Sequence, residues 1–250
     1  MIHYKKLAKI SKEVLRAVEN AVFPPACPIC GKPRVIKNGI RLNICPWCRE
    51  RITYVDEPAC LKCGKKLDDD REYCTDCQKI KHVYNQAVSL YEYSDDIKQS
   101  IYRFKYHNKQ EYAGVYAEEL ARKCGQVIRA WNPDIIMPVP IHASKLKQRG
   151  YNQAALIARE LSRLIGIAVD EQYIRRVRKT LPMKELNNSE RVKNLQNAFQ
   201  IYDNGIIYNK VLIVDDIYTT GATIDACARC LKDYGVKSVY AVTLCIGKGF

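Results

Sequence analysis

The chain has 250 residues, enough for one ordinary domain and a second, smaller one. Hydrophobic residues make up 47% and charged residues 27%, as is typical of a soluble globular protein, and no apolar run approaches the ~18 residues that a membrane span needs. The formal net charge of +14 favours phosphate-rich ligands such as nucleotides or nucleic acid; a basic protein without such a ligand is the alternative. We therefore expect no membrane span and a cytoplasmic location.

The first 23 residues carry charges throughout, which argues against a targeting sequence. Leu7, Ile10, Val14 and Val18 recur at helical spacing. We expect an amphipathic helix over residues 1–23 that packs on the protein. A helix on a membrane surface is the alternative, but its apolar stripe would be modest.

Eight of the twelve cysteines form four CxxC pairs. The two-residue spacing lets one tight turn direct both thiolates at a single tetrahedral metal ion. A disulfide scaffold is disfavoured because the chain shows no secretory signal. We expect a double zinc ribbon over residues 24–83 with two closed Cys₄ sites, each holding one structural Zn²⁺. The expected ligands are Cys27, Cys30, Cys45, Cys48, Cys60, Cys63, Cys74 and Cys77.

The sequence leaves the pairing of these cysteines open. The simplest order places the first two pairs on one ion and the last two on the other, whereas a cross-brace would join the first pair to the third. Because the segment is short and poor in large apolar residues, metal must supply much of its folding energy, and chelation is expected to unfold it while leaving the later domain mostly intact. The other cysteines, Cys124, Cys227, Cys230 and Cys245, are expected to be small buried residues.

From Tyr84 onward, strand and helix patterns alternate. We expect strands at residues 87–93, 134–140, 210–214 and 236–245, and helices at 95–104, 111–131, 152–165 and 222–234. Continuous apolar runs such as residues 211–214 are typical of a parallel sheet covered on both faces. Residues 84–250 are therefore expected to form an α/β domain that binds its ligand where strand carboxyl ends meet loops.

The most informative of these loops is VLIVDDIYTTGAT, residues 211–223. We expect Asp215 and Asp216 at the strand exit, where they can accept hydrogen bonds from vicinal hydroxyls. The Thr-Thr-Gly turn that follows leads into a helix start, whose free N–H groups bind anions. Carboxylates beside a phosphate site must meet hydroxyls or a cation, which favours a phosphorylated sugar carrying Mg²⁺. An Asp-rich helix cap, the alternative, explains one aspartate but not the whole run.

This loop resembles the phosphoribosyl pyrophosphate-binding motif of type I phosphoribosyltransferases. Together with the cysteine pairs, PVPIHASKLKQRGYNQA (138–154) and RVRKTLPMKELNNSERVKNLQNAF (176–199), it makes nearly the whole chain from residue 24 similar to the ComF competence-protein family. The resemblance implies a type I phosphoribosyltransferase fold over residues 84–250, a mostly parallel sheet with helices on both faces. It also implies a ligand, phosphoribosyl pyrophosphate or ribose 5-phosphate with Mg²⁺, and a role in DNA uptake during natural transformation.

The resemblance also implies residue roles. Asp215 and Asp216 would bind the ribose 2- and 3-hydroxyls and are the catalytic candidates. The implied ribose-phosphate site is Asp215, Asp216, Tyr218, Thr219, Thr220, Gly221, Ala222 and Thr223. The implied pyrophosphate site is Lys147, Arg149, Gly150 and Asn152, in a loop that also holds His142 and Lys145 and is rich in donors for oxyanions.

Residues 175–193 look like the loop that closes over the reaction centre in these folds, a solvated charged loop being the alternative. Two positions differ from the family pattern: Met183 stands where Gln is usual, and Lys145 where Arg is usual.

Two functions fit these residues. As a phosphoribosyltransferase, the protein would transfer a group at C1 of the ribose, with Mg²⁺, Arg149 and backbone donors stabilising the leaving pyrophosphate. As a binding module, it would keep the ribose-phosphate site and contact single-stranded DNA or a DNA-uptake helicase through its zinc ribbons and positive charge. The aromatic residues Tyr91, Tyr93, Tyr102, Phe104 and Tyr106 would stack bases in that case, although this spacing is more typical of core residues. A transcription regulator is a weaker third option, because no helix-turn-helix or winged domain supports it.

Overall fold

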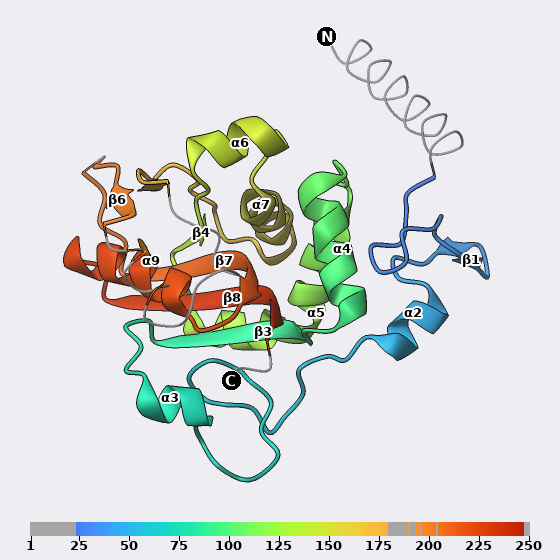
Figure 1. Cartoon of the computed structure of the whole chain (residues 1–250), viewed down its shortest axis with the longest axis horizontal. Helices are drawn as coiled ribbons and strands as arrows, with labels where there is room; N and C mark the ends of the chain where they lie inside the picture. Colours follow the sequence, from blue (N-terminus) through green and yellow to red (C-terminus); the bar gives the residue numbers. More distant parts are fainter. Residues whose placement is uncertain (1–23, 180–189, 191–193, 196, 204, 248–250) are drawn as a thin grey trace.

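The computed structural model describes residues 24–179, 190, 194–195, 197–203 and 205–247 (Figure 1). The helix expected over residues 1–23 and Met183 lie outside these ranges, as does most of the expected closing loop. In the part of the chain that is described, no helix combines the length and the hydropathy needed to cross a membrane.

A four-stranded parallel sheet forms the centre of the molecule, as the sequence predicts. Its strands are β3 (Gln86–Glu92), β4 (Ile135–Pro138), β7 (Lys210–Tyr218) and β8 (Ser238–Ile246), in the spatial order β3-β8-β7-β4. All three pairings are parallel. Side chains alternate between the two faces of β7: Leu212 and Val214 enter one core, and Val211 and Ile213 enter the other.

Helices cover both faces of the sheet (Figure 1). One core contains residues of α4 (Asp95–Tyr106), α5 (Tyr112–Trp131) and α7 (Gln153–Ile165). The opposite core contains α9 (Ala222–Asp233) and the antiparallel pair β5 (Ile174–Arg176) and β6 (Phe199–Ile201). Local signals set several of these bounds: Ser94 caps the start of α4, and Gly166, with φ of 75°, ends α7.

Three features differ from the sequence-based expectation. A short helix, α6 (Ala143–Arg149), forms within the expected basic loop, and the β5–β6 pair was not expected. The third difference concerns the site: β7 continues to Tyr218, so Asp215 and Asp216 lie inside the strand and not after it. The strand continues because β8 offers pairing partners as far as Ile246.

The cysteine-rich segment wraps around the sheet domain. Its elements are β1 (Ile36–Lys37), β2 (Ile40–Arg41), α2 (Pro46–Arg51) and α3 (Thr75–Lys79). Figure 1 shows β1 and α2 beside α4, whereas α3 lies below β3. Between them, Tyr54 forms an antiparallel bridge with Tyr91 on the outer edge of β3. The first ribbon therefore shares one hydrophobic core with the sheet domain, and the second ribbon shares the other.

Candidate functional site

The eight CxxC thiols gather into two groups of four. One group is Cys27, Cys30, Cys45 and Cys48, and the other is Cys60, Cys63, Cys74 and Cys77; within each group the sulfur atoms lie within 4.8 Å of one another. Zn–S bonds of ~2.3 Å place tetrahedral ligands about 3.8 Å apart, and the sulfur atoms of Cys63 and Cys74 are separated by 3.7 Å. All twelve cysteines, each within the described ranges, are free thiols. Sequential pairing is thus confirmed over the cross-brace, and both closed sites fit structural zinc ions.

A pair of carboxylates lies near the carboxyl end of β7. Asp216 donates its backbone N–H to a carboxylate oxygen of Asp215 at 2.8 Å, and its own carboxylate pairs with the ammonium group of Lys105 on α4, also at 2.8 Å. Burial, and then the repulsion of Asp216, raise the pKa of Asp215 to about 7. Burial lowers the pKa of Lys105, but the attraction of Asp216 and Asp215 outweighs it, so that pKa is raised.

Three further cations converge on this pair. Lys145 and Arg149 lie one helical turn apart on α6, and Arg176 ends β5. Burial, and then the positive charges of Arg176, Arg149 and Lys105, lower the pKa of Lys145. Burial also lowers the pKa of Arg176, an effect that Cys227 and Asp215 partly offset. Four cations around two carboxylates leave an excess of positive charge, which attracts a polyanion.

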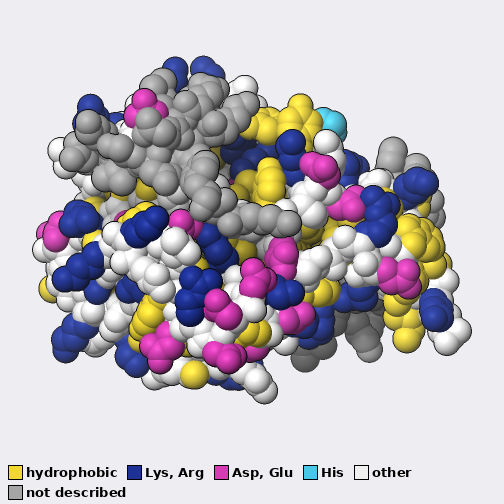
Figure 2. Space-filling model, turned by 60° about the horizontal axis from the view of Figure 1, so that its bottom comes forward, with side chains coloured by type: hydrophobic (Ala, Val, Ile, Leu, Met, Phe, Trp, Pro, Cys, Tyr) yellow, Lys and Arg dark blue, Asp and Glu magenta, His cyan; other side chains and the backbone are white. Residues whose placement is uncertain are grey.

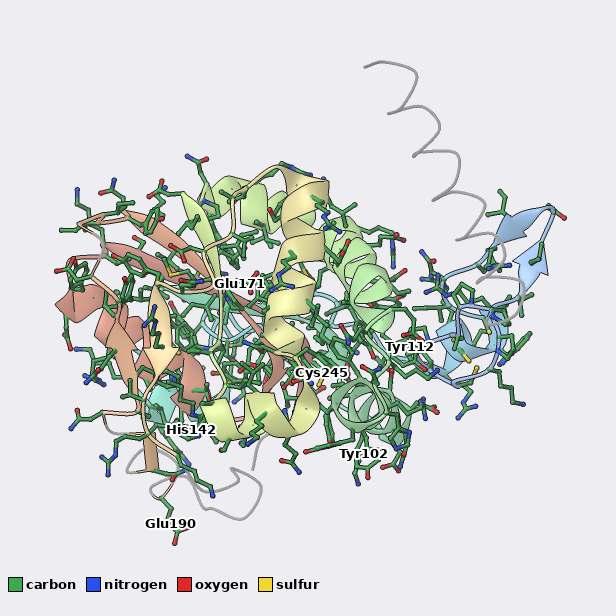
Figure 3. The ribbon with its side chains drawn as sticks, turned by 90° about the horizontal axis from the view of Figure 1, so that it is seen from above. Tyr102, Tyr112, His142, Glu171, Glu190 and Cys245 are labelled. Carbon is green, nitrogen blue, oxygen red and sulfur yellow. The ribbon has the colours of Figure 1, made fainter. Side chains whose placement is uncertain are left out.

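On the face seen in Figure 2, Lys and Arg side chains are interspersed with Asp and Glu. Figure 3 shows the candidate site from above, where α4, which carries Tyr102, and α6, which follows His142, lie on either side of Cys245 near the end of β8. The sulfur of Cys245 lies 3.8 Å from the backbone oxygen of Asp216, so Cys245 marks the floor of the site.

The expected pyrophosphate residues take different positions. The guanidinium of Arg149 lies 5.0 Å from the centre of the Tyr106 ring and donates to its hydroxyl at 3.1 Å; its buried Nε has no hydrogen-bond partner among the described residues. Gly150 ends α6 with φ of 82°, and Asn152 caps α7 while donating to the backbone oxygen of Val139. Lys147 is exposed and lies two positions from Lys145, so it faces away from that side of α6.

The Thr-Thr-Gly turn connects β7 to α9. Gly221 has φ of 76° and is the N-cap of α9, so the first N–H groups of this helix, from Ala222 and Thr223 onward, lack partners within the helix. The buried hydroxyl of Thr220 has no hydrogen-bond partner in the described part of the chain. Uncapped amides and a hydroxyl without a partner at a helix start are the groups that an anion cradle needs, and the cradle itself stays a prediction. Thr219 is exposed in the same turn.

Tyr218 ends β7 directly before this turn. Its side chain is only 4% exposed, and its hydroxyl bonds to that of Tyr84 at 2.7 Å. The side chain therefore holds the turn from beneath, and a contact of Tyr218 with the ligand would involve the backbone.

Lys105 was not among the residues predicted for the ribose-phosphate or pyrophosphate site, and Arg176 was predicted only as part of the closing loop, residues 175–193. The signal for Lys105 was present: it follows Ile97 and Ile101 at four-residue intervals, which places it in line with the buried face of α4. Of the residues considered for base stacking, Tyr91 and Phe104 are core residues, whereas Tyr102 and Tyr106 are each 51% exposed.

Comparison with known proteins defines the class first. The model of the double zinc ribbon domain matches residues 18–78, and the model of the phosphoribosyl transferase domain matches residues 116–249, more than half of the chain. The fold and these matches together define a type I phosphoribosyltransferase-fold protein with an N-terminal double zinc ribbon.

Relatives define the family more narrowly. Competence protein F of Haemophilus influenzae is 30% identical over 214 residues, covering 84% of this chain and 91% of that protein. DNA utilization protein YhgH of Escherichia coli (strain K12) is 27% identical over 225 residues, covering 89% and 97%. Competence protein ComFC of Bacillus subtilis is 27% identical over 219 residues, covering 81% and 83%. The chain belongs to the ComF competence-protein family.

Proposed function

We propose that this site binds phosphoribosyl pyrophosphate, a ribose that carries a phosphate at C5 and a pyrophosphate at C1. The observation that supports this most is the convergence of Lys105, Lys145, Arg149 and Arg176 on the carboxylates of Asp215 and Asp216. Cations alone would suit any polyanion, but the carboxylates require a ligand that also offers hydroxyl donors. A ribose diol between two phosphate groups meets both requirements.

Each part of the ligand has candidate partners. The carboxylates of Asp215 and Asp216 accept hydrogen bonds from the ribose hydroxyls. The 5-phosphate occupies the start of α9, where the Thr220 hydroxyl lacks a partner among the described residues and no side chain caps the first backbone N–H groups. Arg149 and Lys145 hold the pyrophosphate, and the buried Nε of Arg149 is a donor without a partner in the described part of the chain.

The donor set also fits Mg²⁺ bound with the ligand. Mg²⁺ prefers carboxylate and phosphate oxygens, and Asp215 and Asp216 supply buried carboxylate oxygens next to the pyrophosphate position. When bound, Mg²⁺ neutralises charge on the pyrophosphate.

As an enzyme, the protein transfers the ribosyl group: the bond between C1 and the pyrophosphate oxygen breaks, and a nucleophile bonds to C1. Arg149 and Lys145 stabilise the charge that gathers on the leaving pyrophosphate. Lys105 pairs with Asp216 at 2.8 Å and holds this carboxylate in place, so that it can orient the ribose diol while C1 becomes cationic. We place this activity in the cytoplasm, because twelve cysteines without a disulfide among them suit a reducing compartment.

A second candidate function is the handling of single-stranded DNA during natural transformation, with a DNA-uptake helicase as partner. The names of the relatives, which refer to competence and DNA utilization, motivate it. One structural observation supports it: Tyr102 and Tyr106 are half-exposed, their ring centres lie 5.0 Å apart, and Tyr106 contacts Arg149. Exposed aromatic rings beside a cation are typical of base-stacking surfaces.

Calorimetric titration with phosphoribosyl pyrophosphate and Mg²⁺, repeated with single-stranded DNA, tests both functions. The variant that carries Asp215→Asn together with Asp216→Asn should lose phosphoribosyl pyrophosphate binding. The change relieves the repulsion between the two carboxylates but also breaks the ion pair with Lys105, so circular dichroism must show that the variant is folded. Binding that equals that of the parent would show that the ribose-phosphate site is assigned wrongly. DNA binding should survive the double change if the DNA surface is separate.

A further inference from the structure

The second zinc ribbon rests directly on the start of β3. A Cβ atom at Gly64, next to the ligand Cys63, would lie 2.8 Å from the backbone oxygen of Ala87, so only glycine allows this close approach. The Ala87 N–H donates to the backbone oxygen of Lys62 at 2.8 Å. The Lys62 ammonium group donates to the backbone oxygen of Asn85 at 3.1 Å and lies 5.2 Å from the centre of the Tyr84 ring. Residues 82–84, called the linker below, are thus held by this ribbon.

The linker holds the end of β7. The hydroxyls of Tyr84 and Tyr218 lie 2.7 Å apart, both side chains are buried, and the two rings meet edge-on with centroids 6.4 Å apart. Tyr218 is the last residue of β7 and directly precedes Thr219, so this contact holds the phosphate-binding turn at its start.

The linker also holds the beginning of α9. A carboxylate oxygen of Asp225 lies 2.6 Å from Nδ1 of His82, and the other accepts the Val83 N–H at 2.7 Å. Asp225 belongs to the first turn of α9, and its own N–H donates to the backbone oxygen of Gly221 at 2.8 Å. The linker therefore contacts the elements on both sides of the turn formed by residues 219–221.

Gly221 fits closely against these contacts. A Cβ atom there would lie 2.5 Å from the Tyr218 hydroxyl oxygen and 3.0 Å from Cε1 of His82. The His82 ring stacks on that of Tyr84 with centroids 4.9 Å apart, which joins the two contacts into one unit. The shape of the turn is thus set by side chains that do not face the anion cradle.

We infer that the second zinc ribbon positions the phosphate-binding turn, and that His82, Tyr84 and Asp225 are positioning residues for ligand binding. The inference rests on the proposed ribose-phosphate function. A cradle of backbone N–H groups binds a phosphate well only when the groups already point at one place. If a released turn spends nine-tenths of its time in conformations that do not bind, the apparent affinity falls about tenfold.

The first test compares two aspartates that each join the first turn of a helix to a residue outside that helix. Asp225→Ala releases the linker from α9. Asp96→Ala removes an aspartate from the first turn of α4, where it pairs at 2.6 Å with Arg51 of the first zinc ribbon. In the zinc-loaded full chain, Asp225→Ala should lower the affinity for ribose 5-phosphate about tenfold, and Asp96→Ala should leave it unchanged. Equal affinities in both variants, or equal losses, would overturn the inference.

The second test separates positioning from general stability. Tyr84→Phe leaves the Tyr218 hydroxyl without its partner, and the control Tyr116→Phe removes another buried hydroxyl, which bonds to Ser100. Both should lower stability, but only Tyr84→Phe should weaken ribose 5-phosphate binding. The double variant Tyr84→Phe plus Tyr218→Phe should recover stability, because it removes both hydroxyls and leaves no buried hydroxyl without a partner at this contact.

Hydrogen–deuterium exchange tests the positioning role in the absence of ligand, by measuring how well the turn is held. Asp225→Ala and Tyr84→Phe should speed exchange of the amides of residues 218–223, whereas Asp96→Ala and Tyr116→Phe should not. If the parent fails to bind ribose 5-phosphate, the proposed function is wrong, and faster exchange in this turn still supports the positioning role. Unchanged exchange would overturn that role whatever the ligand proves to be.

Discussion

Lys105 and Asp216 form an ion pair within the candidate site, with the ammonium nitrogen 2.8 Å from a carboxylate oxygen. The two residues come from different elements, α4 and β7, and Lys105 lies outside the stretch that the phosphoribosyl transferase model matches. The pair joins α4 to the ligand-binding end of the sheet. A residue of α4 therefore places a positive charge beside the two carboxylates of the candidate site.

Lys105→Met should weaken binding of phosphoribosyl pyrophosphate. Methionine keeps the unbranched side chain but removes the charge, so the carboxylates repel the ligand phosphates more strongly. The loss should be ~1.5–3 kcal/mol, the range of a hydrogen bond to a charged group. Lys109→Met is the control: its side chain is 40% exposed and pairs with Glu111 at 3.6 Å. Calorimetry that finds the same affinity for both variants would contradict a role for Lys105 in the site.

The raised pKa of Asp215 predicts an unusual pH dependence. In an unfolded chain an aspartate has a pKa of ~3.9, whereas burial and Asp216 raise it to about 7 in the folded protein. Between these values the folded state holds more protons, so the free energy of unfolding decreases as pH rises. The stabilising contribution of this group is complete below pH ~4 and is lost as pH rises through the folded pKa. In Asp215→Asn the decrease should be smaller. Urea unfolding of the parent and the variant at several pH values measures this decrease. If the free energy of unfolding falls equally with pH in both proteins, the prediction is wrong.

The sequence predicted those parts of the fold that depend on local patterns. Apolar runs such as residues 211–214 identify the buried strands, and CxxC spacing identifies the zinc ligands, because neighbours in the chain carry both signals. The end of β7 could not be found this way, since its last residues extend only because β8 runs beside them. Helix α6 lacks buried residues, so it has no apolar periodicity to recognise.

The candidate site shows the same division. Asp215, Asp216 and the Thr-Thr-Gly turn stand out because they are contiguous in the chain. Lys105 and Arg176 meet them only through the fold, and the burial of Tyr218 depends on Tyr84, a residue of the linker. The sequence gives no sign that the linker, residues 82–84, joins the second zinc ribbon to the turn.

Zinc removal should affect the whole chain. From the sequence, we expect chelation to unfold the cysteine-rich segment and leave the later domain mostly intact. In the structure, however, the zinc ligands belong to the cores of the sheet domain: Cys27, Cys45 and Cys48 lie in one core, and Cys60, Cys63 and Cys74 lie in the other. The purified protein should contain two zinc ions per chain. Chelation should lower the melting temperature of the sheet domain and weaken ribose 5-phosphate binding. Differential scanning calorimetry before and after chelation measures this, and an unchanged transition for the sheet domain would argue that the ribbons fold independently.

Tyr102→Ala should weaken the binding of single-stranded DNA by ~1–3 kcal/mol, because the substitution removes a ring on which a base can stack. The control is Tyr73→Ala, which removes another exposed tyrosine, 41% exposed, from the second ribbon. Because phosphate contacts dominate such binding, log affinity should also fall with log salt by about 0.7 per contact. Fluorescence anisotropy with labelled oligonucleotides of differing sequence measures both effects. Salt-independent binding, or equal effects of the two substitutions, would contradict a stacking surface on α4.

Thr220→Val should stabilise the free protein and weaken ligand binding. The Thr220 hydroxyl is buried without a hydrogen-bond partner among the described residues, so a methyl group of similar shape removes a desolvated polar group. The same change removes a donor to the 5-phosphate, and affinity for ribose 5-phosphate should fall by ~1.5–3 kcal/mol. Thr243→Val is the control with the opposite expected effect on stability. The Thr243 hydroxyl bonds to that of Ser89 at 2.7 Å, so removing it should lower stability. For Thr220→Val, urea unfolding measures the expected gain in stability and calorimetry measures the expected loss of affinity. A variant that is less stable, or that binds as the parent does, would show that Thr220 has a structural role and not a ligand-binding one.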